Sequence, residues 1–255
     1  MAFIPMDADI LPPSDDRIFK TLLTHPNAKN VLIDIVSTVI EQKVLNVEVR
    51  NNELPISDIE EKAERFDVNC TIENGDQVDV EMHCSRIEEV GEVRVSFLNK
   101  YTYYLTDLHS SQKSKGVRYK DMVRTYQVTF TTHDVFPKHP GFVHRFSLRS
   151  ENGEQLSDQI NMVIIELSKL HGVLKKPVAK LTLFEKWSLF LNYAPDPMQR
   201  PLINDIIRNR EEIGMAATLL QEISKDEKER ARLRSRKMYI TDMIVTVKKS
   251  ASNGN

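Results

Sequence analysis

Acidic side chains gather on two short runs of sequence that flank a single turn. In residues 65–72 and again in residues 78–83, polar and apolar side chains alternate, and the polar positions include Asp67, Asp79 and Glu81. Such alternation is typical of a β-strand with one buried face. Carboxylates that share a face can hold a divalent cation or share a proton. The runs therefore predict an antiparallel hairpin with a candidate metal site.

The register of this hairpin decides whether the acidic side chains face one another. A two-residue turn at Asn74-Gly75 would pair polar with apolar positions along the whole ladder. A three-residue loop, with Gly75 in the left-handed conformation, instead pairs Asp67 with Glu81 and lets apolar meet apolar. Directly opposed Cβ atoms lie roughly 4.5–5.5 Å apart. Two carboxylates at that distance repel unless a proton, Mg²⁺ or Mn²⁺ neutralises them.

The polar face of this hairpin also has a simpler interpretation. Antiparallel sheets commonly keep one face in water, and Arg65 could neutralise Asp67 and Asp79 there. In that case the acids need no metal ion. The residues alone leave the two interpretations open.

The order Asp67, hairpin turn, Glu81-Met82-His83 resembles the PD-(D/E)XK nuclease core, in which an Asp and an acid-X-Lys tripeptide lie on adjacent strands. Other segments resemble the PD-(D/E)XK nuclease family transposases, also called recombination-promoting nucleases, and the resemblance spans about residues 14 to 245. In chain order these segments are Asp16-Arg17-Ile18-Phe19-Lys20, Tyr103-Tyr104, Gln112 with Gly116-Val117-Arg118-Tyr119, Ile165-Glu166-Leu167-Ser168-Lys169, Trp187 with Phe190-Leu191, and Ile223-Ser224-Lys225-Asp226.

The resemblance implies an α/β (α+β) fold, a restriction-endonuclease-like αβββαβ core with a mixed sheet, followed by a C-terminal helical region. We expect the nuclease-like core in residues 14–172 and a helical extension packed on or flanking it in residues 173–250. The implied function is a metal-dependent DNA endonuclease that hydrolyses phosphodiester bonds in recombination or in mobile elements. The alternative is a catalytically degenerate nuclease fold that acts as a DNA-binding or assembly module.

The resemblance also implies the roles of the central residues. Asp67 and Glu81 would bind Mg²⁺ or Mn²⁺, with the backbone carbonyl of Met82 as a further ligand, and His83 would complete the catalytic set. His83 stands where most PD-(D/E)XK enzymes have Lys and where this branch commonly has Gln. A neutral His can act as a base or orient a water molecule, but it does not supply the fixed charge of Lys.

Several further residues are candidates for supporting roles. Asp16 could join the metal site, although its position just past Ser14 favours plain helix capping. Asp79 could bind a second metal ion, and Gln112 and Tyr119 could orient phosphate or water, Tyr119 being as easily a packing residue. A basic cluster suits contacts with DNA phosphates, with a solvated loop as the alternative: Lys113, Lys115, Arg118 and Lys120.

Composition limits the partners. The formal net charge of −2, from 35 basic and 37 acidic residues, argues against a protein that coats nucleic acid nonspecifically. The basic stretch in residues 228–237 is interleaved with acids and favours an exposed helix face. The spacing of His133, His139 and His144 matches no standard zinc pattern, and Cys70 and Cys84 are expected to be reduced core residues. We expect a cytoplasmic protein without membrane spans, with DNA as partner; a homodimer stays open.

Periodicity and turn residues predict the individual elements. In the helix expected at residues 93–114, five apolar side chains lie near helical spacing: Phe97, Tyr101, Tyr104, Leu105 and Leu108. Helices are expected at residues 14–23, 29–41, 93–114, 184–193, 202–223 and 226–247, and strands at residues 44–49, 65–72, 78–83, 123–131 and 160–167, with a loop and one short strand in residues 139–154.

Overall fold

The computed structural model describes most of the chain. The described residues are 2–50, 67–84, 93–112, 118–235 and 238. Arg65 and the candidate DNA contacts Lys113 and Lys115 lie outside these ranges, so their roles remain predictions. Among the helices within these ranges, we find none with the length and apolar character needed to cross a membrane.

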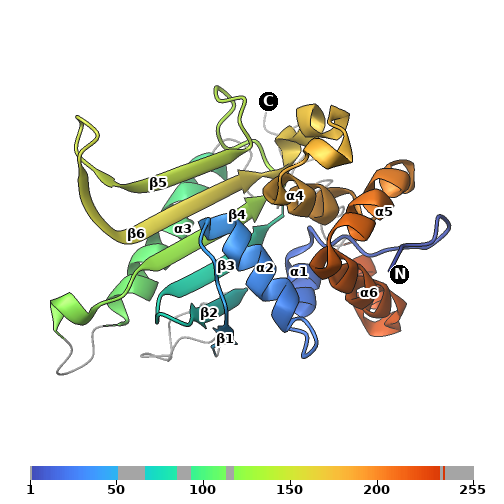
Figure 1. Cartoon of the computed structure of the whole chain (residues 1–255), viewed down its shortest axis with the longest axis horizontal. Coiled ribbons are helices and arrows are strands. Elements are labelled where there is room, and N and C mark those ends of the chain that lie inside the picture. The colour runs from blue at the N-terminus through green and yellow to red at the C-terminus, as the bar shows by residue number, and fades with distance from the viewer. Residues whose placement is uncertain (1, 51–66, 85–92, 113–117, 236–237, 239–255) are drawn as a thin grey trace, which may run out of the picture.

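A six-stranded mixed sheet forms the centre of the molecule (Figure 1). The strands lie in the order β1-β2-β3-β4-β6-β5. Antiparallel pairs join β1 to β2, β2 to β3 and β5 to β6, while β3, β4 and β6 run parallel. Their bounds are β1 Val47–Val49, β2 Val68–Ile72, β3 Gln77–His83, β4 Thr125–Thr131, β5 Val143–Arg149 and β6 Gln155–Glu166. The predicted α/β fold with a mixed sheet is therefore confirmed.

Helices cover both faces of the sheet, with α2 and α3 on opposite faces (Figure 1). The α-helices are α1 Asp16–Leu23, α2 Lys29–Ile40, α3 Val93–Ser110, α4 Leu183–Tyr193, α5 Arg200–Asn209 and α6 Glu211–Lys225. The 3-10 turns are η2 Tyr119–Asp121, η3 Leu167–Lys175, η4 Val178–Lys180 and η5 Pro197–Gln199. The αβββαβ order predicted for the core is therefore present, from α2 through β4.

The hairpin between β2 and β3 has the predicted register. Asn69 pairs with Asp79, and Val68 pairs with Val80. Gly75 has φ +91°, and its N–H donates to the carbonyl of Ile72 over 2.9 Å. The left-handed conformation adds one residue to the turn, so apolar positions face one another across the ladder.

Two hydrophobic cores follow from the alternation along β3. Val78, Val80 and Met82 belong to the larger core, which includes α1, α2 and the C-terminal helices. Helix α3 packs over the other face and buries the five residues predicted from its spacing, against Met162 and Ile164 of β6. These five are Phe97, Tyr101, Tyr104, Leu105 and Leu108. The even-numbered face of β3 is thus apolar, and its odd-numbered face lies toward α3.

Some predicted boundaries were wrong. Asp15, rather than Ser14, is the N-cap of α1, because its carboxylate accepts the N–H groups of Arg17 and Ile18. The single helix expected over residues 202–223 is two helices, because Arg210 between them is extended with φ −147° and ψ 115°. Its guanidinium binds the buried Asp34 of α2.

The larger hydrophobic core includes residues of α4, α5 and α6 together with residues of α1 and α2. Trp187 of α4 donates to Asp34 of α2 over 2.8 Å, and the contact joins two segments far apart in the sequence. The expected domain boundary at residue 172 stays a prediction.

Candidate active site

Three carboxylates lie on the face of the hairpin that α3 covers. Asp79 and Glu81 alternate with Val80 along β3, and their exposed fractions are 0% and 3%. Asp67 directly precedes β2 and is half-buried. Acidic side chains are rarely buried to this extent without a partner. Their neighbours therefore decide what this site can do.

Hydrogen bonds across the hairpin hold Asp67 and Glu81 together. The backbone N–H of Asp67 donates to Glu81 Oε1 over 2.7 Å. In turn, Asp67 Oδ2 accepts the backbone N–H of Met82 over 3.1 Å. Each carboxylate is thus fixed by the strand that carries the other, as the predicted register requires.

Strand β4 adds polar side chains that the sequence analysis did not identify. The parallel register places Gln127 beside Asp79 and Thr129 beside Glu81. Gln127 Nε2 donates to Asp79 Oδ2 over 2.8 Å. The sequence of β4 places a polar residue at every second position. The structure shows that the strand is buried along its whole length, so these polar side chains lie inside the protein.

Several buried oxygens at this site accept no hydrogen bond within the described residues. They are Asp79 Oδ1, Gln127 Oε1 and Thr129 Oγ1. Buried acceptors normally have a donor or a bound ion. Carboxylate, amide and hydroxyl oxygens are the ligands that Mg²⁺ and Mn²⁺ prefer, so the residues present fit a hard divalent cation.

The electrostatics of the cluster point in the same direction. Burial raises the pKa of Asp67 to about 6, and the charge of Asp16 adds to the rise. Burial also raises the pKa values of Asp79 and Glu81 well above their usual range, and repulsion within the cluster increases both. A bound cation would favour the ionised form of all three carboxyl groups.

His83 packs between β3 and α3. Its Nδ1 lies 3.1 Å from the hydroxyl oxygen of Tyr101. The ring meets Phe97 and Tyr101 edge-on, with centroid distances of 5.0 Å and 5.8 Å. The third position of the tripeptide thus joins the strand to the helix, and its catalytic role stays a prediction.

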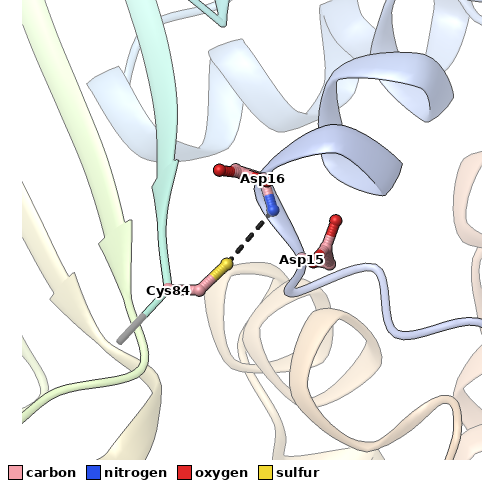
Figure 2. Close-up of side chains that lie close together, drawn as sticks. All are labelled: Asp15, Asp16 and Cys84. Carbon is pink, nitrogen blue, oxygen red and sulfur yellow. Dashed lines mark hydrogen bonds between the residues drawn. The ribbon is translucent and has the colours of Figure 1, made fainter. Parts of the chain in front are cut away.

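Asp16 lies at a second group of potential ligands (Figure 2). Asp15 and Asp16 come from the start of α1 and Cys84 follows β3, and their ligand atoms lie within 4.8 Å of one another. The backbone N–H of Asp16 donates to Cys84 Sγ over 3.2 Å, and the thiol donates to the carbonyl of Ser14. Cys84 is a free thiol, as predicted, but it is half-buried, whereas Cys70 lies in the core.

The residues predicted after α3 lie apart from the carboxylates. Gln112 Nε2 donates to Thr125 Oγ1 over 2.8 Å, and Gln112 Oε1 accepts the N–H of Val123 over 3.0 Å, so this amide ties the end of α3 to the start of β4. Tyr119 is 75% exposed. Arg118 pairs with Asp121 over 2.6 Å. Contacts of Tyr119, Arg118 and Lys120 with DNA stay predictions.

Several of the remaining histidine and basic candidates have structural partners within the described residues. His144 Nε2 lies 2.5 Å from Glu166 Oε2, and His133 lies beside His83, 5.3 Å between ring centroids. In the basic stretch after α6, Arg230 pairs with Asp9, and Arg232 pairs with Glu229. Within the described residues, His133, His139 and His144 do not come together as a metal-binding group.

Comparison with known families agrees with the resemblance inferred from the motifs. A family model described as PD-(D/E)XK nuclease family transposase matches residues 13–250 of the 255-residue chain. No curated protein and no solved structure gives a significant match.

Proposed function

We propose that this chain, which belongs to the PD-(D/E)XK nuclease family transposases, is a metal-dependent endonuclease that hydrolyses phosphodiester bonds in DNA. The family supports a nuclease-like function connected with mobile elements. The observation that carries the finer proposal is the cluster of the half-buried Asp67 with the buried Asp79 and Glu81 on one hairpin face, beside buried oxygens that accept no hydrogen bond within the described residues. Such a cluster is costly to bury unless a cation or a shared proton neutralises it.

In this proposal Asp67 and Glu81 hold Mg²⁺ or Mn²⁺, and the Met82 carbonyl is a further ligand. When bound, the ion supplies charge neutralisation at the scissile phosphate and favours ionisation of a water molecule. Asp67 and Glu81 are already oriented by the backbone N–H groups of the opposite strand. Asp79 has a supporting role, since Gln127 orients it through Oδ2. His83 orients the attacking water or accepts its proton.

One observation favours a second candidate, a degenerate nuclease fold that binds DNA without cutting it. His83 replaces the usual Lys, and its ring packs against the aromatic side chains of α3. The tripeptide therefore lacks the fixed positive charge that Lys brings to a phosphate. This alternative predicts salt-dependent DNA binding without hydrolysis.

Nicking of supercoiled plasmid tests the proposal. Wild-type protein is incubated with Mg²⁺, Mn²⁺ or EDTA beside Asp67→Asn and Glu81→Gln, which keep shape but remove charge. Glu48→Gln makes the same chemical change at an exposed position of β1. We expect cation-dependent nicking that falls roughly 10²–10³-fold in the two site variants, the usual size for loss of transition-state charge stabilisation, and that stays unchanged in Glu48→Gln.

Two results would contradict the endonuclease. Nicking that persists in both site variants would show that the activity comes from elsewhere. A folded wild-type protein that binds DNA but cuts under none of these conditions would leave the degenerate module as the function.

A further inference from the structure

We propose that Lys100 of α3 binds the scissile phosphate and so supplies the positive charge that His83 does not. The inference rests on the proposed function, because it assigns a substrate contact at the same site. It concerns a residue outside the hairpin and outside the tripeptide.

Aromatic side chains hold the Lys100 ammonium beside the tripeptide. Nζ lies 4.8 Å from the ring centroid of Tyr101 and 5.0 Å from that of Tyr104. Both distances are within the range of a cation–π interaction. Nζ also lies 3.5 Å from the Tyr101 hydroxyl, which is 3.1 Å from His83 Nδ1. One hydroxyl group thus separates the Lys100 charge from the side chain at the third tripeptide position.

The charge of Lys100 acts on the whole acidic cluster. Burial raises the pKa of Asp67, Asp79 and Glu81, and the Lys100 ammonium opposes that rise at each of the three. Lys20 of α1 opposes it at Asp67. Lys100 therefore faces the place where the cation and the phosphate would meet.

Exposure and pairing leave this ammonium available to a ligand. Lys100 is exposed, whereas Asp79 and Glu81 are buried beneath the helix. Within the described residues Lys100 forms no ion pair, in contrast to Lys169 and Lys176, which bind Glu166 and Glu185. An ammonium held over two aromatic rings and reachable from solvent is well suited to a DNA phosphate.

DNA binding in EDTA tests the contact independently of cleavage. The affinity for a fluorescein-labelled duplex is measured by anisotropy at several salt concentrations for wild type, Lys100→Met and Lys100→Arg. Lys29→Met is the matched control, since Lys29 is an exposed helical lysine on α2. We expect Lys100→Met to reduce the slope of log affinity against log salt by about one, the value for one lost phosphate contact. Lys100→Arg and Lys29→Met should keep the wild-type slope.

Thermal unfolding in EDTA separates electrostatics from packing. If Lys100 faces the carboxylates, Lys100→Met lowers Tm in the wild-type background and lowers it less beside Glu81→Gln, because the two sites are then coupled. A purely structural Lys100 lowers Tm equally in both backgrounds. An unchanged salt slope or an equal loss of Tm overturns the inference. Wild type that binds duplex but never nicks it overturns the endonuclease alone, since the slope still tests Lys100.

Discussion

Two groups of buried carboxylates in this protein have opposite environments. Asp34 and Glu166, 6% and 0% exposed, bind the cations of Arg210 and Lys169 and accept N–H donors as well. Asp79 and Glu81 are equally buried, and within the described residues neither forms an ion pair. A buried carboxylate with a structural role pairs with a cationic side chain of the protein. A buried carboxylate without such a pair indicates a functional site, where a ligand can neutralise it.

Glu166→Gln should have the largest effect on stability. The substitution removes the buried carboxylate that pairs with Lys169 and His144 and leaves Lys169 only its more exposed partner Asp134. Breaking a buried pair costs about 3 kcal/mol. Chemical denaturation should show the loss as a lower midpoint. A midpoint within experimental error of wild type would remove the distinction drawn between the two groups of acids.

Addition of Mg²⁺ should stabilise the wild-type protein by binding to the carboxylates of the hairpin, Asp67 and Glu81. Binding only to the folded state contributes about 2.7 kcal/mol at a concentration of 100 times Kd. Differential scanning calorimetry should show a rise in Tm for wild type and Glu48→Gln, and little or none for Asp67→Asn and Glu81→Gln. An equal rise in Tm for all four proteins would show that Mg²⁺ binds at a site other than Asp67 and Glu81.

Glu81→Gln should stabilise the protein in EDTA at neutral pH. The amide removes the cost of burying a carboxyl group whose pKa is raised by burial and by repulsion from Asp79 and Asp67, for a gain on the order of 1 kcal/mol. Equilibrium unfolding in urea measures it against wild type. A lower midpoint in Glu81→Gln would mean that the carboxylate is already neutralised in the metal-free protein.

The Asp67 carboxyl should make the stability of the protein depend on pH. Its pKa rises from 3.8 to about 6 on folding. Between these values the native state binds more protons than the unfolded state, so stability falls as pH rises, and above about pH 6 the full penalty is present. The difference in Tm between wild type and Asp67→Asn in EDTA should follow this fall across the interval, and a flat difference would contradict the shift.

Local patterns predicted much of the site. The alternation along residues 65–72 and 78–83, together with Gly75, was sufficient to find the hairpin register, because a slip by one residue would expose one hydrophobic face. The spacing of apolar residues in α3 likewise identified the side that packs on the sheet. The cap of α1 and the break at Arg210 were missed, since neighbouring Ser and Asp cap equally well and the break depends on Asp34 in a distant helix.

By itself, the sequence determined the pairing of Asp67 with Glu81, because the two residues flank one short turn. It also determined the family resemblance, because each of its motifs is a short stretch of sequence. Only the tertiary structure brought Gln127 and Thr129 beside the acids and Lys100 over them. The parallel register of β3 with β4 joins strands separated by a whole helix, and the placement of α3 depends on packing against β6. No local periodicity encodes such contacts, since they form only when the helix closes over the finished sheet.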